Sequence, residues 1–75
     1  MTDVRDLIAS ILQLSAEGLA EEDGPETIAA WDSLKTILLA SMVEITYGIT
    51  LSNSDIEQFT SVGAVREVVA RHDGH

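Results

Sequence analysis

The segment that most constrains this chain is residues 33–47, a run without glycine or proline that ends at Gly48. Asp32 precedes it, and an aspartate there is a good helix N-cap because its carboxylate accepts a hydrogen bond from an unpaired amide of the first turn. Gly48 can adopt the left-handed conformation that commonly ends a helix. The sequence therefore predicts one long helix over residues 33–47.

A strand interpretation competes with the second half of this helix. Residues 43–47 alternate apolar and polar side chains, and residues 49–51 continue after the glycine, a pattern typical of two strands joined by a turn. However, residues 34–40 do not alternate, and two short strands without further partners would hardly be stable. We therefore favour the helix.

Three other segments have helical signals. Apolar residues recur every three or four positions over residues 3–14, which predicts an amphipathic helix capped by Thr2. Two overlapping capping boxes, starting at Ser52 and Ser54, predict a helix of one or two turns. Thr60 is expected to cap a last helix that buries a face of valines. These valines are Val62, Val65, Val68 and Val69.

The segment between the first two helices, residues 15–30, has no helical or strand pattern and contains Gly18, Gly24 and Pro25. A connection this long is unusual in so small a protein, so it is either functional or held down by its own side chains. The candidate anchors are Leu19, Ile28 and Trp31.

The small size of the chain limits its core. In a chain of 75 residues only about 60% of the unfolded surface can be buried, and without cysteine neither a disulfide nor a thiolate metal site can support the fold. The longest apolar run has four residues, too short for a signal peptide or a membrane span. We expect a soluble, cytoplasmic protein that is monomeric on its own and consists of one domain, residues 1–75.

The chain is strongly acidic, with thirteen acidic and four basic residues and a net charge of −9. Such a surface repels nucleic acids and anionic membranes and favours basic partners. Six of the acids lie between residues 17 and 32, a block that is typical of a solvated loop. No metal site is expected, because His72 and His75 lie on a predicted frayed tail without further ligands.

Ser33 is the candidate functional residue. In the first turn of the predicted helix its hydroxyl lies beside free backbone N–H groups at the positive end of the helix dipole, a favourable place for a phosphoryl group. The alternative is that Asp32 and Ser33 only cap the helix. No histidine lies nearby to activate the hydroxyl, so nucleophilic catalysis by the chain is not expected and we predict that it is not an enzyme.

The order of these features resembles the acyl carrier protein family. The resemblance covers residues 4–71, and its most specific parts are the Asp-Ser-Leu run at residues 32–34 and its spacing from the Thr-Ser-Val run at residues 60–62. It implies an all-α, four-helix bundle of three longer helices and one short helix, with a long loop between the first two. It also implies that Ser33 is the attachment point of 4′-phosphopantetheine.

The same resemblance implies a chemistry. A phosphopantetheinyl transferase uses coenzyme A to place the arm on Ser33, and loading and accepting enzymes then exchange acyl groups as thioesters on its thiol, so the chain itself needs no cysteine. Residues 25–28 leading into residues 31–34 resemble free-standing carriers of specialised pathways more than the fatty-acid type. The resemblance therefore implies polyketide or other antibiotic biosynthesis, or a related, fatty-acid-like pathway. Two alternatives stay open: a peptidyl or aminoacyl carrier of a nonribosomal peptide system, and an unmodified acidic adaptor.

The predicted central helix carries two apolar stripes. Leu39, Val43 and Tyr47, supported by Ala40, are expected in the core. The second stripe either is also core or forms a surface that docks partner enzymes beside the arm. The candidate docking residues are Asp32, Leu34, Ile37, Leu38, Ser41 and Ile45.

Overall fold

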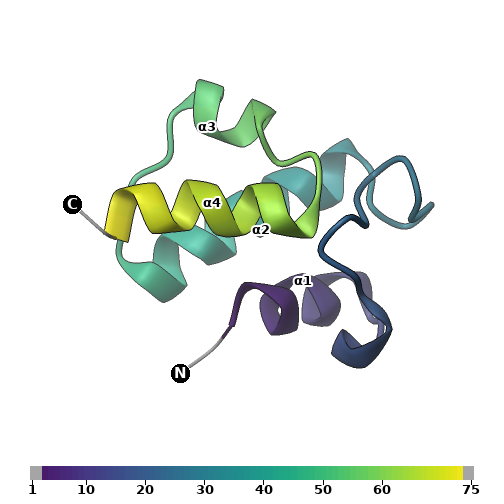
Figure 1. Cartoon of the computed structure of the whole chain (residues 1–75). Helices are drawn as coiled ribbons and strands as arrows, with labels where there is room; N and C mark the ends of the chain where they lie inside the picture. The colour runs from purple at the N-terminus through teal and green to yellow at the C-terminus, as the bar shows by residue number, and fades with distance from the viewer. Residues whose placement is uncertain (1–2, 74–75) are drawn as a thin grey trace.

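The computed structural model describes residues 3–73 and has helices and turns, with no strand within that range. In chain order the elements are α1 (Val4–Leu12), a 3₁₀ turn η1 (Ala16–Gly18), α2 (Ser33–Tyr47), α3 (Asn53–Glu57) and α4 (Val62–Asp73) (Figure 1). This confirms the predicted all-α fold with three longer helices and one short one. No helix in the described range is long and apolar enough to cross a bilayer.

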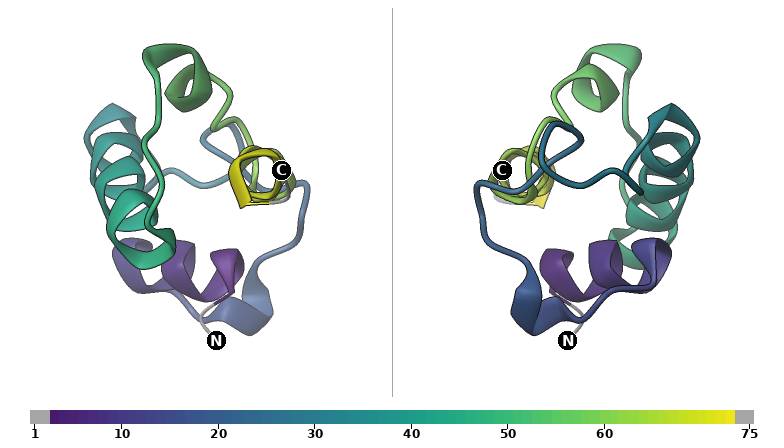
Figure 2. Two further views of the ribbon diagram at one scale, coloured as in Figure 1. Left: turned by 90° about the vertical axis from the view of Figure 1, so that its left-hand side faces the viewer. Right: turned by 90° about the vertical axis from the view of Figure 1, so that its right-hand side faces the viewer.

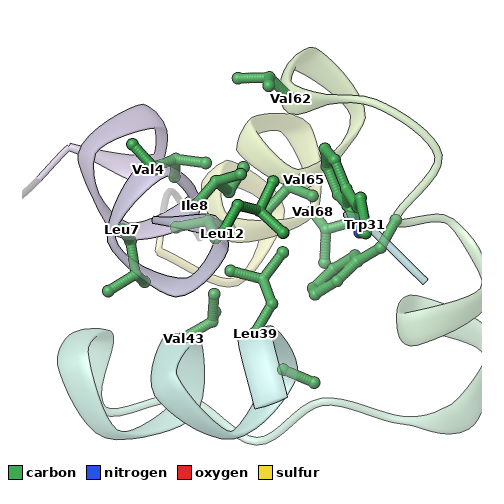
Figure 3. Close-up of a cluster of buried hydrophobic side chains, with 14 of the residues drawn as sticks. Val4, Leu7, Ile8, Leu12, Trp31, Leu39, Val43, Val62, Val65 and Val68 are labelled. Atoms are coloured by element: carbon green, nitrogen blue, oxygen red, sulfur yellow. The ribbon is translucent and has the colours of Figure 1, made fainter. Parts of the chain in front are cut away.

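Helices α2 and α4 lie beside each other, with α1 packed against both on one side and α3 on the opposite side (Figure 2). Their apolar faces meet in one core, to which the connecting segments also contribute (Figure 3). The predicted valine face of α4 is buried there. The other buried residues are Val4, Leu7, Ile8, Ala9, Leu12, Leu19, Trp31, Leu39, Ala40, Val43, Leu51 and Phe59.

Helix α2 has the predicted boundaries, and Gly48 ends it in the left-handed conformation with a φ of 66°. Its second half is helical although residues 43–47 alternate, so the strand interpretation is wrong. Val43 is buried and Tyr47 is half-buried against the core, whereas Ile45 is exposed. Packing of Val43 and Tyr47 on one face of the helix outweighs the local preference for a strand.

The N-terminal cap of α1 is Asp3, whose carboxylate accepts a hydrogen bond of 3.3 Å from the N–H of Arg5. The predicted cap, Thr2, lies outside the described residues. The helix ends at Leu12, two residues earlier than predicted, because Gln13 adopts the left-handed conformation with a φ of 59°. Two N–H···O bonds from Gln13 then close the last turn.

The predicted cap of α4, Thr60, lies one residue before the observed cap. The hydroxyl of Ser61, and not that of Thr60, accepts a hydrogen bond from the N–H of Ala64 at 3.0 Å. Adjacent serine and threonine are both good caps, so the local pattern does not rank them. The prediction that the frayed tail begins at His72 is also wrong, because α4 includes this residue. His75 lies outside the described residues.

Apolar side chains hold the long segment between α1 and α2 against the core, as predicted. Leu19 and Trp31 are buried, and Ile28 is half-buried. Gly24 lies so close to the chain before α4 that a Cβ atom there would be 2.1 Å from the carbonyl oxygen of Thr60. A larger residue at this position would push the two segments apart.

The same segment caps α4 with its backbone. The carbonyl oxygen of Asp23 accepts a hydrogen bond of 2.8 Å from the N–H of Val62, and that of Glu21 accepts one of 2.9 Å from the N–H of Gly63. First-turn N–H groups have no acceptor within their own helix. The segment therefore satisfies two donors of α4 and fixes its own position at the same time.

Arg66 on α4 joins this segment to the start of α1. Its guanidinium donates hydrogen bonds to Glu21 at 3.0 Å and to Asp3, including one of 3.2 Å. These hydrogen bonds lower the pKa of both carboxyl groups and raise the pKa of the guanidinium. At least one acid of the acidic block is thus bound to the fold and is not only a solvated charge.

Candidate functional site

Ser33 is the first residue of α2, and its side chain is exposed. The carboxylate of Asp32 accepts a hydrogen bond of 2.9 Å from the N–H of Lys35, as expected for an N-cap. The N–H groups of Ser33 and Leu34 have no acceptor within the helix because the helix starts there. The Ser33 hydroxyl therefore lies beside free donors at the positive end of the helix, where a phosphoryl group is stabilised.

Trp31 fixes the chain directly before Ser33. Its indole is 2% exposed, and Nε1 donates a hydrogen bond of 3.0 Å to the hydroxyl of Thr36 in the first turn of α2. That hydroxyl in turn donates to the carbonyl oxygen of Asp32 at 3.1 Å. Residues on both sides of Ser33 are thus tied together and to the core, so the hydroxyl has a defined position.

An open hollow of about 430 Å³ lies beside Ser33. The segment before α2, the first turns of α2 and helix α3 each form one wall. Its lining residues are Pro25, Trp31, Asp32, Ser33, Thr36, Ile37 and Ile56. Asp32 is the only charged residue among them, so the walls are mainly apolar.

The second apolar stripe of α2 is exposed, which rules out the alternative that it is core. The exposed fractions are 66% for Leu34, 58% for Ile37, 46% for Leu38 and 76% for Ile45, and Ser41 is also exposed. Of the other stripe, Leu39, Ala40 and Val43 lie in the core as predicted, whereas Tyr47 is only half-buried against it. Met42, 40% exposed, belongs to the exposed stripe and was missed, although it stands four residues after Leu38 and three before Ile45.

Comparison with known proteins identifies this arrangement. The model of the phosphopantetheine attachment site family matches residues 2–69. The chain belongs to this family of carrier proteins. Its fold is similar to that of a holo acyl carrier protein from Geobacter metallireducens, solved by solution NMR, with a TM-score of 0.79 and 22% sequence identity over 92% of this chain and 79% of that chain. None of the curated proteins compared with the chain is a match.

The family confirms two of the predictions made from the sequence. The cofactor of the carrier is covalently bound 4′-phosphopantetheine, and such a carrier is not catalytic itself. The residues at the start of α2 fit this group: Ser33 offers an exposed oxygen, and the free N–H groups suit a phosphodiester. The group supplies a thiol at the end of a flexible arm, which a chain without cysteine lacks.

Within residues 3–73, His72 lies on α4 and does not line the hollow beside Ser33. Nε2 of His72 lies 2.9 Å from a carboxylate oxygen of Asp55 and so joins α4 to α3. The backbone N–H of Ser52 and, to a smaller extent, His72 lower the pKa of Asp55 by hydrogen bonding to it. Within residues 3–73 no three potential metal-ligating side chains come together.

Charge is nearly absent from the exposed stripe of the carrier. The one acidic residue within α2, Glu44, accepts a hydrogen bond of 2.8 Å from the N–H of Leu51 and so holds the segment that leads to α3. Asp32 lies before the stripe and caps α2. Asp32 is therefore the acidic residue that lines the hollow beside Ser33, and it belongs to the cap of α2 and not to the exposed stripe.

Proposed function

We propose that this protein carries acyl or aminoacyl groups as thioesters on a 4′-phosphopantetheine arm attached to Ser33. We further propose that it serves polyketide or related specialised biosynthesis in the cytoplasm and that residues 1–75 act as one carrier domain. The observation that carries the attachment site is the exposed Ser33 hydroxyl at the first position of α2, within a chain of the phosphopantetheine attachment family.

In the attachment reaction, the Ser33 oxygen forms a bond to the phosphorus that carries the pantetheine of coenzyme A. The bond from that phosphorus to the adenosine bisphosphate breaks, and the hydroxyl proton passes to a base of the transferase. The free N–H groups of α2 stabilise the resulting phosphodiester. Trp31 and Asp32 keep the attachment point rigid, so the mobility of the cargo comes from the arm alone.

We propose the exposed stripe of α2 as the docking surface for the transferase and for the loading and accepting enzymes. The candidate residues are Asp32, Leu34, Ile37, Leu38, Ser41 and Ile45, with Met42 added from the structure. An exposed apolar stripe of this kind is typical of an interaction surface. It begins directly at the attachment point, so an enzyme that covers it has its active site within reach of the arm.

The attachment is tested by incubating the protein with coenzyme A and a broad-specificity phosphopantetheinyl transferase, followed by intact mass measurement. We expect one added phosphopantetheine on the wild type and none on Ser33→Ala. Ser10→Ala is the matched control, because Ser10 is an exposed serine on α1, outside the proposed docking surface, and its loss should leave the modification intact. An unmodified wild type, or modification of Ser33→Ala, would refute the proposal.

A further inference from the structure

A second hollow lies in the segment between α1 and α2, and we call it the loop pocket. It has a volume of about 270 Å³ and is open to solvent. Leu14, Leu19 and Ile28 line it with apolar side chains, and Asp23 and Thr27 line it with polar ones. The loop pocket shares no lining residue with the hollow beside Ser33, so the two are separate sites.

Hydrogen bonds fix the shape of the loop pocket. The carboxylate of Asp23 accepts one of 2.9 Å from the N–H of Ala20 and one of 3.1 Å from the hydroxyl of Thr27. The same hydroxyl accepts one of 3.0 Å from the N–H of Gly24. These polar groups are engaged in holding the segment together. A partner that enters the loop pocket therefore meets a preformed apolar surface, which lowers the entropic cost of binding.

The size of the loop pocket suits a single apolar side chain. Pockets for small molecules usually measure roughly 300–1,000 Å³, and the loop pocket is smaller than that. Protein interfaces are commonly anchored by a few side chains that fill pockets on the partner. Leu14 is 44% exposed, and within residues 3–73 it is the one large, well-exposed apolar residue outside α2. It offers apolar surface that no other part of the described chain covers.

Acidic side chains flank the loop pocket along the chain. Glu17, Glu22 and Glu26, here called the acidic rim, each directly precede a residue that lines it, and all three are exposed. Glu21 forms an ion pair with Arg66, but within residues 3–73 no ion pair engages the acidic rim. Its charges are therefore available to a cationic partner. A second copy of this chain, with its net charge of −9, would be repelled.

We propose that the loop pocket is a docking site for a basic segment of a partner protein, which inserts one large apolar side chain flanked by lysine or arginine. The apolar side chain contacts Leu14 and Ile28, and the flanking cations meet the acidic rim. This site is additional to the exposed stripe of α2 and does not depend on a modification of Ser33. It is close to that region along the chain, because the carbonyl oxygen of Ile28 accepts a hydrogen bond of 3.0 Å from the N–H of Trp31.

The proposal is tested by NMR titration of the unmodified protein with a five-residue peptide that has one leucine between two pairs of lysines and blocked ends. We expect saturable shifts of the Leu14, Gly18, Thr27 and Ile28 resonances. A peptide with serine in place of the leucine should bind about tenfold more weakly, because the apolar contact is lost. A peptide with glutamate in place of each lysine should not bind. Equal affinities of the leucine and serine peptides, or shifts confined to the stripe of α2, would overturn the proposal.

A serine substitution shows whether the leucine of the peptide enters the loop pocket. Leu14→Ser removes apolar surface from the pocket, and Ile45→Ser makes the same kind of change on the stripe of α2. Leu14→Ser should weaken the leucine peptide about tenfold and leave the serine peptide unchanged, whereas Ile45→Ser should affect neither. Equal effects of the two substitutions on the leucine peptide would overturn the proposal. A thermal melt checks that both variants are folded.

The acidic rim supplies a second pair of variants that leaves the apolar surface intact. Glu26→Gln should weaken the leucine peptide about twofold, as for an exposed ion pair. Glu57→Gln removes the same charge from an exposed position on α3 and should leave the affinity unchanged. Equal weakening by both variants would show that the peptide responds only to net charge and would overturn the proposal. Because the protein is unmodified throughout, these results do not depend on whether Ser33 carries an arm.

Discussion

Substitution of glutamate for Leu38 or Ile45 tests the docking surface most sharply, because it should separate binding from stability. Ile45 is 76% exposed and Leu38 is 46% exposed, so neither change opens a large cavity. Surface substitutions of this kind usually change the free energy of unfolding by no more than about 0.5 kcal/mol. Glutamate is also a good helix former. We therefore expect a nearly unchanged melting temperature.

Binding should respond much more strongly. Full burial of a leucine or isoleucine side chain stabilises by about 1.5–3 kcal/mol, and most of this is still available for Ile45 and about half for Leu38. Since about 1.4 kcal/mol corresponds to a tenfold change in affinity, Ile45→Glu should weaken a partner about tenfold or more and Leu38→Glu severalfold. Burial of the new carboxylate in the interface adds to the loss of affinity.

The assay is the rate of phosphopantetheine transfer to Ser33 at subsaturating carrier, measured beside a thermal melt. Thr46→Glu is the matched control, because it adds the same charge to an exposed position of α2 outside the stripe. Leu39→Ala provides the opposite contrast: this neighbour of Leu38 is 2% exposed, and its truncation should cost about 2–5 kcal/mol of stability.

Varying the salt concentration provides a second test of the same docking surface. The acidic segment before α2 should steer basic partners over long range, and charges separated by more than about 10 Å are screened at 0.1 M ionic strength. Raising the salt should therefore slow association and leave dissociation from the apolar stripe much less affected. If both glutamate variants melt and react like the wild type, or if either unfolds, the reasoning about this face is wrong.

Three further predictions concern the segment that positions Ser33. Trp31→Ala should cost roughly 3–5 kcal/mol, seen in chemical denaturation, because a side chain that is 2% exposed is removed; a cost below about 1 kcal/mol would contradict its role. Gly24→Ala should lower the melting temperature clearly, because its Cβ would lie 2.1 Å from the carbonyl oxygen of Thr60; an unchanged melt would show that the segments separate freely. Arg66→Gln should be less stable than wild type at neutral pH. Arg66 lowers the pKa of Asp3, so the folded wild-type protein binds fewer protons than the unfolded chain near that pKa. The difference in stability between wild type and Arg66→Gln should therefore shrink as the pH falls below about 4. A stability difference that is constant with pH would refute this prediction.

Local signals predicted the central helix well. Asp32 and Gly48 act through contacts within a few residues, so the boundaries of α2 could be read directly from the sequence. Where two adjacent residues offer the same chemistry, as Thr60 and Ser61 do, the pattern placed the cap one residue away. Such errors are small because they concern the choice between neighbours and not the existence of a helix.

Contacts between distant segments could not be predicted in this way. The exposure of the second stripe depends on which elements cover α2, and α3, with five residues, leaves much of it open. The carbonyl caps that Asp23 and Glu21 provide for α4 leave no local signature, because any residue has a carbonyl oxygen. The hollow likewise depends on a contact between distant segments, because Ile56 of α3 and Ile37 of α2 both line it.

These contacts make the region around Ser33 rigid. Hydrogen bonds join Trp31 to Thr36 and Thr36 to Asp32 around Ser33. The carbonyl groups of Glu21 and Asp23 hold the preceding segment against α4. An enzyme that docks on α2, as we propose, would therefore meet a proposed attachment point whose position varies little, so little of its binding energy would be spent on ordering the carrier. In the proposed function, the freedom to move between active sites then belongs to the arm.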